Sequence, residues 1–344
     1  MEIKKKMLAG VFRGNGRLSV EEVDVPAVTE PDEVLIKIDA CSVCGTDVHI
    51  LEVPPAGFDV APGTVLGHEI AGQVADVGSG VKKIKVGDRV VVEPNDYCGI
   101  CRYCLDGLTN HCENQTSLGV TKNGGFAEYV KVTEKVTHKI SDDLPVNIAV
   151  FAEPLACVVN GFRKVNARPG QSSLVIGAGP IALIFVQMLR SAGVNPIIVS
   201  EPSETRREFA KKSGAHYVLD PFHEDVAKAA KELTGLGPDI VIDVVGSQMG
   251  EAVKAVKNGG IVLLFGYNTK AEPKVVQHMI IDKEIQVLGT WIARGTFPDA
   301  VKILEKNVLD LEMLITHVLP LEKLDEGISA LRKGEGLEVI IVPR

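Results

Sequence analysis

The chain has 344 residues, of which 45% are hydrophobic and 24% are charged, and its formal net charge is −8 at pH 7. This length and apolar content are enough for two domains with separate cores. The acidic balance argues against a nucleic-acid backbone or an anionic membrane as partner, since both favour a basic surface. Seven cysteines, an odd number, fit a reducing compartment better than a disulfide framework. The apolar stretch 7–12 is too short for a signal-peptide core, and we expect a cytoplasmic protein.

The first 150 residues predict a β-barrel-like domain, because they contain short alternating segments at 33–38, 72–77 and 89–92. Loops of this region carry the metal-ligand residue types Cys44 and His68 with the adjacent Glu69, and Glu153 lies at the junction of the two domains. A thiolate, an imidazole and a carboxylate around an open position are typical of catalytic zinc. Spacing alone does not join them, because they lie far apart in the sequence. Taken singly, each has an ordinary explanation, such as a buried cysteine or a helix-capping side chain.

Four cysteines in one short stretch are the strongest local signal in the chain: Cys98, Cys101, Cys104 and Cys112, spaced C-x2-C-x2-C-x7-C. Four thiolates this close in sequence can converge on one tetrahedral ion, and a closed shell of this kind favours a structural zinc. The first three also match the spacing of bacterial iron–sulfur ferredoxins, where the fourth cysteine follows three residues later and precedes proline. Here the fourth comes seven residues later, which favours zinc over a cluster.

A glycine-rich turn follows a short buried strand at 174–176. The run Gly177-Ala178-Gly179-Pro180-Ile181-Ala182 matches G-x-G-x-x-A and leads into a helix that we expect to end at Gly193. Gly177 allows the tight turn, and Gly179 lets the backbone approach a pyrophosphate at the helix N-terminus. Pro180 and Ile181 open that helix and complete the candidate cofactor loop.

A second strand at 196–200 ends in Glu201. A carboxylate at this position can accept hydrogen bonds from the ribose hydroxyls of NAD and would repel the 2′-phosphate of NADP. The alternative is a solvated loop charge. Arg206 and Arg207 lie close enough in sequence to contact the ribose or a 2′-phosphate. Glu201 therefore favours NAD as the cofactor, and the two arginines keep NADP as the alternative.

Apolar stretches continue to alternate with helical ones up to residue 292, at 217–219, 239–245, 260–266 and 285–289. Together with the first two, they predict six strands and a doubly wound parallel sheet over 157–292. Beyond it, the sequence predicts a helix with one apolar face, formed by Ala300, Ile303, Leu304 and Val308. A second helix at 321–332 and a strand at 337–342 are expected to follow.

Several of these motifs, in this order, resemble the zinc-dependent medium-chain alcohol dehydrogenases from about Lys6 to the C-terminus. The carrying segments are Cys44-Gly45-Thr46-Asp47-Val48-His49, Gly67-His68-Glu69, Val86-Gly87-Asp88-Arg89-Val90, the four-cysteine stretch, Gly124-Gly125-Phe126-Ala127-Glu128-Tyr129 and Gly177-Ala178-Gly179-Pro180. The resemblance implies an α/β protein with a GroES-like β-barrel catalytic domain and a Rossmann cofactor domain. It places the catalytic domain at 1–156 with a zinc lobe at about 95–115, the NAD-binding domain at 157–292, and a completing segment at 293–344.

The resemblance also implies two zinc ions per chain, one at a catalytic site and one in the four-cysteine lobe. The catalytic zinc ligands fall on Cys44, His68 and Glu153, with Glu69 as an alternate carboxylate, so the pair is treated as one coupled position. Asp47 matches a residue that orients the ligand histidine. Thr46 and His49 match a proton relay from the alcohol to solvent by way of the cofactor ribose. The alternative for Thr46 and His49 is a local turn with an exposed histidine.

The expected reaction is hydride transfer between NAD and a secondary alcohol. Glu153-Pro154-Leu155-Ala156 and Gly295-Thr296-Phe297-Pro298 resemble the polyol branch, whereas the stretch 198–203 resembles L-threonine 3-dehydrogenases. Ile292 and Ala293 depart from the polyol pattern, which argues against sorbitol itself. We therefore expect the broader class of a polyol or sugar-derived substrate, with L-threonine as alternative. The apolar strand at 285–289 is a candidate pairing edge for a homodimer or homotetramer. A non-catalytic zinc-binding interaction protein is the alternative from another class.

Overall fold

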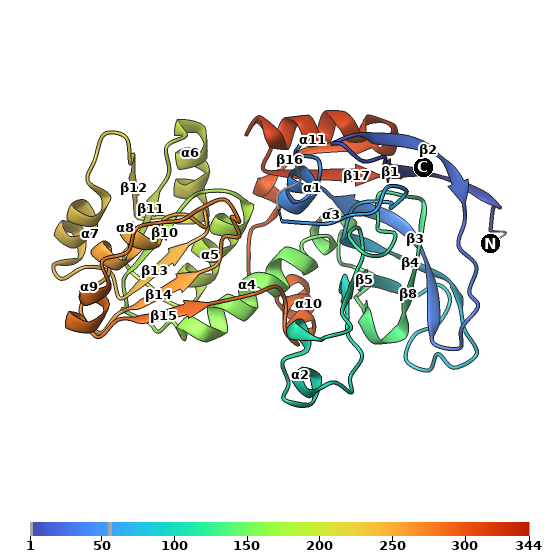
Figure 1. Cartoon of the computed structure of the whole chain (residues 1–344), viewed down its shortest axis with the longest axis horizontal. Helices are drawn as coiled ribbons and strands as arrows, with labels where there is room; N and C mark the ends of the chain where they lie inside the picture. Colours follow the sequence, from blue (N-terminus) through green and yellow to red (C-terminus); the bar gives the residue numbers. More distant parts are fainter. Residues whose placement is uncertain (1–2, 54–56, 344) are drawn as a thin grey trace. The chain divides into compact units, whose positions relative to one another are not determined.

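The computed structural model describes residues 3–53 and 57–343 and divides into two compact units (Figure 1). Unit 1 comprises Met1–Ala156, Ala293–Asn307 and Leu311–Arg344, and unit 2 comprises Cys157–Ile292 and Val308–Asp310. The N-terminal and C-terminal parts of the chain therefore fold together, and the central part forms a separate body.

Unit 1 is built on a seven-stranded sheet, in which β8 pairs with β3 beside the path β16-β17-β3-β4-β5-β9. Its strands are β3 (Glu33–Ser42), β4 (Glu69–Val77), β5 (Arg89–Val92), β8 (Tyr129–Thr133), β9 (Thr137–Lys139), β16 (Ile315–Pro320) and β17 (Glu338–Val342). All pairs are antiparallel except β16 with β17. A hairpin of β1 (Lys6–Phe12) and β2 (Leu18–Asp24) lies outside this sheet. Because β17 pairs with β3, the last strand of the chain belongs to the same sheet as strands from its N-terminal part.

The helices of unit 1 are short, and several of them carry or flank candidate site residues. They are α1 (Gly45–Ile50), α2 (Arg102–Leu105), α3 (Val146–Ala149), α10 (Phe297–Glu305) and α11 (Leu324–Arg332), with 3-10 turns η1 (Thr109–His111), η2 (Glu134–Val136), η3 (Glu312–Leu314) and η4 (Leu321–Lys323). Two-residue strands β6 (Asn95–Asp96) and β7 (Thr116–Ser117) pair at the base of the four-cysteine lobe. Helix α4 (Ala152–Val165) begins in unit 1 and continues into unit 2.

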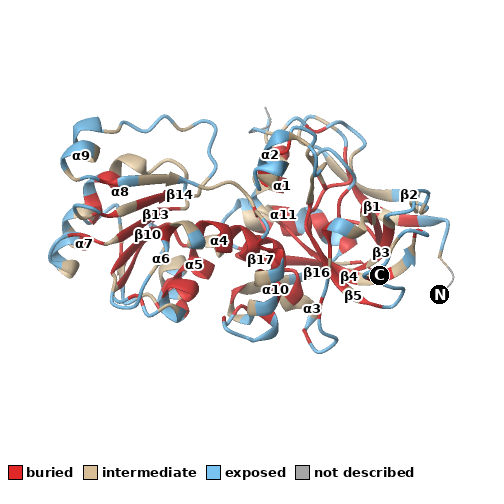
Figure 2. Ribbon diagram, turned by 90° about the horizontal axis from the view of Figure 1, so that it is seen from below, coloured by how far each residue is buried: buried red, intermediate tan, exposed pale blue. Residues whose placement is uncertain are grey.

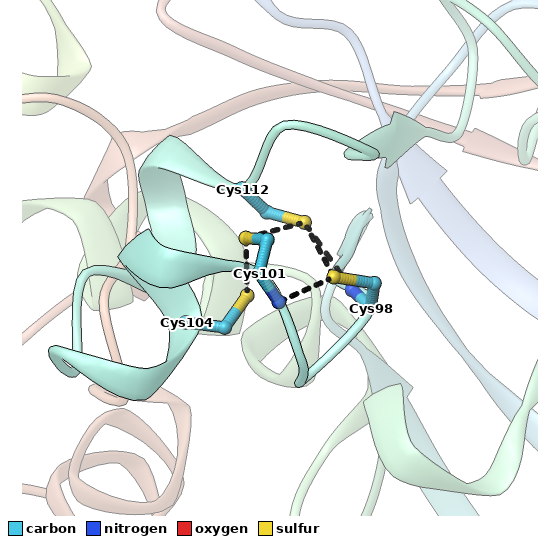
Figure 3. A group of neighbouring side chains, drawn as sticks. All are labelled: Cys98, Cys101, Cys104 and Cys112. Carbon is cyan, nitrogen blue, oxygen red and sulfur yellow. Dashed lines mark hydrogen bonds between the residues drawn. The ribbon is translucent and has the colours of Figure 1, made fainter.

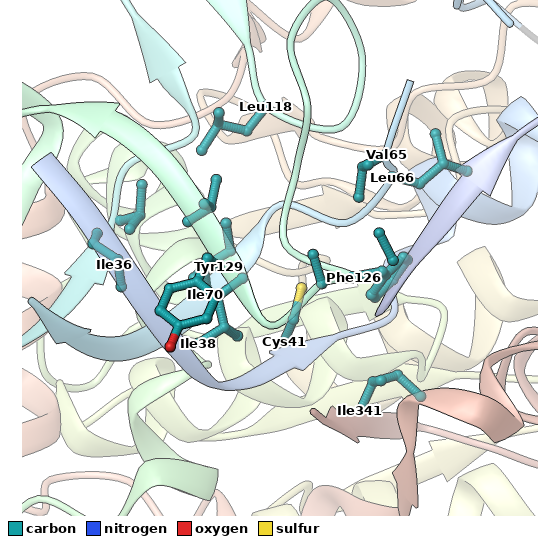
Figure 4. Close-up of a cluster of buried hydrophobic side chains, with 14 of the residues drawn as sticks. Ile36, Ile38, Cys41, Val65, Leu66, Ile70, Leu118, Phe126, Tyr129 and Ile341 are labelled. Atoms are coloured by element: carbon teal, nitrogen blue, oxygen red, sulfur yellow. The ribbon is translucent and has the colours of Figure 1, made fainter. Parts of the chain in front are cut away.

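The core of unit 1 lies against strands β3, β4 and β17, where Ile36, Ile70 and Ile341 pack in one buried cluster with Phe126 (Figure 4). Phe126 is fully buried. Gly67, with φ of +87°, leaves room for its ring, since a Cβ atom there would lie 2.8 Å from the Phe126 side chain. This packing fixes the backbone immediately before His68.

Unit 2 is a six-stranded parallel sheet with the strand order β12-β11-β10-β13-β14-β15. Its strands are β10 (Ser173–Ile176), β11 (Ile197–Ser200), β12 (Tyr217–Leu219), β13 (Ile240–Asp243), β14 (Ile261–Leu264) and β15 (Gln286–Gly289). Its helices are α5 (Pro180–Ser191), α6 (Glu204–Ser213), α7 (Val226–Thr234), α8 (Met249–Ala255) and α9 (Gln277–Asp282). Figure 2 shows the central strands β10 and β13 fully buried. The order reverses at β10, which is the arrangement of a doubly wound nucleotide-binding sheet.

Some boundaries differ from the sequence-based expectation. Helix α5 ends at Ser191, and Gly193 follows with φ of +78°. The expectation for Val308 is wrong: α10 ends at Glu305, and Val308 is 48% exposed. The three residues Val308–Asp310 belong to unit 2, where Gln187 both donates to and accepts from the Asp310 backbone. Residues 321–323 form the turn η4, so α11 begins only at Leu324.

Among the described residues, one helical stretch, Val146–Val165, is long and apolar enough to cross a membrane. Of its most apolar window, 72% is buried inside the structure. Core helices of water-soluble proteins pass the same test, so this stretch is weak support for a membrane span.

We expect Phe126→Ala to lower the free energy of unfolding of unit 1 by about 3–5 kcal/mol, since it removes a buried ring and leaves a cavity. Phe222→Ala is the matched control, because the Phe222 side chain is 80% exposed and its loss should cost little. Urea unfolding of both variants measures the difference. Equal midpoints for the two would contradict this description of the core.

Candidate metal centres and cofactor site

Four cysteine side chains converge in the lobe formed by β6, α2, η1 and β7 (Figure 3). The Sγ–Sγ distances are 3.5 Å for Cys101–Cys104, 3.9 Å for Cys101–Cys112 and 3.5 Å for Cys112–Cys98. A disulfide would hold two sulfurs at about 2 Å. A zinc ion with about 2.3 Å bonds requires sulfurs about 3.8 Å apart at the corners of a tetrahedron. The sulfur positions therefore fit a tetrahedral metal ion and not a disulfide.

Backbone donors favour the thiolate forms of Cys98 and Cys101, whereas burial raises the pKa of the Cys104 thiol to about 12. Cys101 N–H donates to the Cys98 sulfur at 3.3 Å, and Asn114 N–H donates to the Cys112 sulfur at 3.4 Å. The backbone N–H groups of Ile100 and Cys101 lower the pKa of the Cys98 thiol to about 6. A thiol in this setting ionises readily and becomes a metal ligand.

A second cluster lies where β3 ends and β4 begins. Ligand atoms of Cys44, His68 and Glu69 all lie within 4.8 Å of one another. Cys44 is the residue immediately before α1, and Glu69 is the first residue of β4. The antiparallel pairing of β3 with β4 sets Ser42 opposite Glu69, which brings the two loops together. Glu153, in the first turn of α4, is also buried and acts electrostatically on Glu69, although its ligand atoms do not belong to this described group.

Asp47 holds the loops of this cluster in place. It is fully buried, and its carboxylate accepts hydrogen bonds from Cys44 N–H at 2.9 Å and Gly67 N–H at 3.3 Å. Its Oδ1 lies 3.9 Å from His68 Nδ1. One carboxylate therefore spans both ligand-bearing loops and lies beside the imidazole, which suits an orienting role.

Acidic groups gather in this cluster, and burial disfavours their ionised forms. Burial first, and then Glu69 and Glu153, raises the pKa of the Cys44 thiol well above its usual value. Burial, followed by Glu153, raises the pKa of Glu69 to about 7. Burial lowers the pKa of His68, but Asp47, Glu153 and Glu69 outweigh it and raise the pKa overall. A bound divalent cation relieves this repulsion, so the donor set fits zinc.

Thr46 and His49 lie on α1, one turn apart. Both are partly exposed. His49 Nδ1 lies 3.0 Å from Glu52 Oε1, and its side chain is 44% exposed, which leaves the imidazole in contact with solvent. The helix thus places a hydroxyl two residues from Cys44 and an imidazole at the surface.

The glycine-rich loop of unit 2 has the geometry that a pyrophosphate requires. Gly177 has φ of +107°, and a Cβ atom there would lie 2.9 Å from Val244. Gly179 caps α5 and has no atom within 4 Å of an added Cβ, so a ligand can approach its backbone. Pro180 occupies the first turn of α5, and Ile181 follows it, partly exposed.

Glu201 holds this loop against the end of β11. Its carboxylate accepts from Ala178 N–H at 2.8 Å and Ser203 N–H at 2.9 Å, and it is 5% exposed. Arg207 donates to the Glu201 and Pro202 carbonyls and pairs with Asp220 at 3.0 Å. The backbone N–H of Arg206 donates to Ser203 Oγ, and its side chain is half-buried. The Arg207 guanidinium thus bonds to groups of the protein itself. Arg206 is the nearby cation that could contact a ribose or a phosphate.

Sequence reasoning missed two polar residues that act on the Cys44 cluster, and it gave Asn160 no structural role. Ser42 and Glu338 are buried beside Glu69. Asn160 Nδ2 donates to the carbonyls of Trp291 and Ile292, at 3.1 and 2.6 Å, and Ile292 has φ of +37°. An acidic residue in the otherwise apolar stretch 337–342 was the one available signal for Glu338.

Thr296 is fully buried, and its hydroxyl donates to the Ala156 carbonyl at 2.7 Å. This hydroxyl secures the start of α10 to α4 and is not free to contact a substrate. A polyol substrate is therefore not expected to bond to the Thr296 hydroxyl, although the stretch 295–298 resembles the polyol branch.

Comparison with known proteins agrees with this architecture. Residues 30–142 match the family described as alcohol dehydrogenase GroES-like domain, and residues 180–306 match zinc-binding dehydrogenase. The chain is 37% identical to L-threonine 3-dehydrogenase of Thermococcus kodakarensis, covering 94% of this chain and 93% of that one. It is 32% identical to D-arabinitol dehydrogenase 1 of Uromyces fabae, covering 94% of both. A solved zinc-binding dehydrogenase from Sinorhizobium meliloti bound to NADP superimposes with a TM-score of 0.93 at 32% identity, over 99% of this chain and 100% of that one.

The fold and these matches define a zinc-binding dehydrogenase with a GroES-like domain and a Rossmann domain. The chain belongs to the zinc-dependent medium-chain alcohol dehydrogenase family, an assignment that the sequence motifs predicted and the comparisons confirm. It is therefore an oxidoreductase that acts on CH–OH groups with a nicotinamide cofactor. The predicted fold class is confirmed as well.

We expect Cys98→Ser to reduce the zinc content by one ion per chain and to lower the melting temperature, because a serine hydroxyl is a poor zinc ligand. Cys157→Ala is the control, since Cys157 is buried outside both ligand clusters and should leave the zinc content unchanged. Elemental analysis of the purified variants gives the count. Unchanged zinc in Cys98→Ser would show that the lobe does not hold it.

Proposed function

We propose that this chain is an NAD-dependent dehydrogenase of a secondary alcohol on a polyol or sugar-derived molecule, with one catalytic and one structural zinc per chain. The convergence of Cys44, His68 and Glu69 carries the proposal. Three donors of these types with a fourth position open are typical of catalytic zinc, whereas the four-cysteine lobe has no such opening. Glu153 is buried and acts electrostatically on Glu69. We therefore treat the two carboxylates as one position, of which either could bind the zinc.

The chemistry that the bound groups supply is Lewis acidity toward an alcohol oxygen, from zinc, and hydride acceptance, from the nicotinamide. The chain's own residues hold and move the proton. The Thr46 hydroxyl would relay the proton, taking up that of the substrate hydroxyl as it releases its own toward His49. His49 is exposed beside Glu52 and would exchange the proton with solvent. Asp47 keeps the His68 ring oriented while this occurs.

We infer that NAD is the preferred cofactor and that Glu201 sets this preference. Its buried carboxylate lies at the end of β11, where it would repel a 2′-phosphate. A related structure contains NADP, and Arg206 is the residue of this chain that could favour that cofactor.

The names of the relatives favour two candidate substrates. D-arabinitol dehydrogenase, a relative named for a polyol, favours our proposal. L-threonine is the second candidate, because several relatives at 36–38% identity are named L-threonine 3-dehydrogenase. L-threonine carries a carboxylate and therefore requires a cation in its pocket. Arg294, half-buried immediately before Gly295, is a candidate for that cation.

Purified, zinc-replete protein should be assayed for NADH formation with polyols, inositols, sugar acids, small diols and L-threonine. Turnover of a polyol supports the proposal. If L-threonine alone reacts, and Arg294→Ala abolishes that reaction while Arg294→Lys retains part of it, the second candidate is correct and the polyol proposal is wrong.

The remaining parts of the proposal concern organisation. We propose domain limits of 1–156, 157–292 and 293–344, a homodimer or homotetramer that pairs through the β15 edge, and a cytoplasmic location. The side chains of β15 are partly or fully exposed, and an open strand edge invites pairing. Light scattering of the holoenzyme measures the assembly.

We expect Glu201→Gln to shift the ratio of kcat/KM for NADP to kcat/KM for NAD upward by about tenfold or more. The carboxylate accepts a charge-assisted hydrogen bond from the NAD ribose, and loss of such a bond costs about 1.5–3 kcal/mol. The amide oxygen still accepts from a backbone N–H, so the loop should remain folded. Glu204→Gln, exposed in the first turn of α6, is the matched control. An unchanged cofactor ratio in Glu201→Gln would contradict the assigned role.

We expect Thr46→Ala to lower kcat by about 10²-fold or more, because the substrate hydroxyl loses its proton acceptor. Thr46→Ser keeps the hydroxyl and should retain most of the activity. Steady-state rates at saturating alcohol and NAD give the comparison, with zinc content measured to confirm an intact metal site. Equal rates for the alanine and serine variants would exclude the relay.

A further inference from the structure

Asn160, in the second half of α4, binds the backbone where the chain leaves β15. Its side-chain amide donates to the carbonyls of Trp291 at 3.1 Å and Ile292 at 2.6 Å, and the residue is 2% exposed. Both partners are carbonyl oxygens, so only the NH2 end of the amide can bond to them. One turn further along α4, Lys164 donates to the Gly289 carbonyl at 2.6 Å. Two side chains of one helix therefore hold three carbonyls of the segment 289–292.

The backbone of Ile292 lies in the left-handed region, which a β-branched residue rarely adopts. Its φ is +37°, and crowding at the Cβ atom makes such a conformation costly. A strained residue of this kind persists only where its surroundings determine its conformation. The two carbonyls that Asn160 binds belong to the two peptide planes that flank the Ile292 Cα atom. One side-chain amide thereby orients both planes and restrains φ and ψ of Ile292.

Trp291, immediately before this residue, contacts the loop that follows β14. Its ring centroid lies 5.0 Å from that of Tyr267. Next to Tyr267, Gly266 packs against the loop that follows β13, since a Cβ atom at Gly246 would lie 2.6 Å from the Gly266 carbonyl oxygen. In that loop, the Asp243 carboxylate accepts from three backbone N–H groups at 2.8–2.9 Å. The segments after β13, β14 and β15 are thus joined in one series of contacts that ends at Trp291.

These three segments lie along the edge of the sheet where a dinucleotide binds. Parallel sheets of this kind bind ligands outside the carboxyl ends of their strands, at the point where the strand order reverses. The glycine-rich loop after β10 suits a pyrophosphate, and Glu201 after β11 is the proposed partner of the adenosine ribose. The nicotinamide half would then extend in the other direction, across the carboxyl ends of β13 and β14 and toward β15. The Trp291 segment therefore borders the expected nicotinamide end of the site.

We propose that Asn160 is a positioning residue for cofactor binding: by holding Ile292 in its left-handed conformation, it fixes Trp291 and the loops that pack against it at the nicotinamide end. The inference rests on the proposed function, because it takes NAD to bind along this edge. It deepens that proposal by adding a residue of α4 that need not contact the cofactor. The series of packed loops carries its effect to the cofactor.

Trp291 is the only tryptophan in the chain, so tryptophan fluorescence of the full-length protein reports on this segment alone. Two signals are measured. One is the quenching of Trp291 emission by acrylamide, which reports how open and mobile the segment is. The other is the decrease of that emission as NADH binds, since NADH absorbs light where tryptophan emits, and it gives the NADH affinity.

Asn160→Asp keeps the size of the side chain but presents carboxylate oxygens to two carbonyls, so both hydrogen bonds are lost. We expect this variant to increase acrylamide quenching of Trp291 and to weaken NADH binding by about 2- to 10-fold, the range for loss of a neutral hydrogen bond. Asn166→Asp makes the same change at an exposed position just after α4. It is the matched control and should leave both signals unchanged.

A double-variant cycle tests whether Asn160 acts through Ile292. Glycine adopts the left-handed conformation without strain, so Ile292→Gly should make the segment less dependent on its hydrogen bonds. Asn160→Ala should therefore weaken NADH binding less in the Ile292→Gly background than in the wild type, by about twofold or more. Additive effects would overturn the inference. Should Asn160→Asp not fold, this cycle tests the same contact independently.

Wild-type NADH affinity and wild-type quenching in Asn160→Asp would overturn the inference and leave the proposed function intact. Weaker NADH binding with unchanged Trp291 quenching would overturn it too, because Asn160 would then act on general stability and not on this segment. If NADH binds to the wild-type protein without changing Trp291 emission, the segment does not border the cofactor and the inference fails. If the wild-type protein binds neither NADH nor NADPH, the proposed function itself fails.

Discussion

The structure depends on one electrostatic constraint: more acidic groups are buried around Cys44 and His68 than a metal-free interior can hold in ionised form. Asp47, Glu69 and Glu153 are all buried there, beside the half-buried Cys44. Like charges at these separations in a low-dielectric interior cannot all ionise without a counterion. A divalent cation removes the conflict, and the same cation is what the chemistry on an alcohol requires. One divalent cation would therefore both neutralise the buried acidic groups and supply the catalytic chemistry.

Strand pairing explains why these groups meet. The sheet of unit 1 aligns the ends of β3, β4 and β17, so residues from the beginning and the end of the chain face one another. Asp47 bridges the two loops through backbone N–H groups. Phe126 packs over Gly67 and fixes the approach to His68. The four-cysteine lobe is a separate case, since it is closed by contacts within a short stretch and by its own backbone donors.

The sequence predicted most of what is local. The cysteine spacing, the glycine-rich turn and Glu201 each lie within one short segment, and the structure brings their members together. The link between Cys44, His68 and Glu153 came from family resemblance, because spacing carries no information on long-range pairing. Glu338 escaped notice for the same reason: it lies on β17, which pairs with β3 from the other end of the chain. Val308 was misplaced because helical periodicity continues past the turn at which α10 ends.

Anomalous scattering at the zinc edge, from crystals of the zinc-replete protein, tests the central claim most directly. The account predicts two peaks per chain. One should lie among the sulfurs of the four-cysteine lobe, and the other should lie within bonding distance of Cys44, His68 and one of the carboxylates Glu69 or Glu153. A single peak in the lobe, with the Cys44 site empty in zinc-replete crystals, would contradict it.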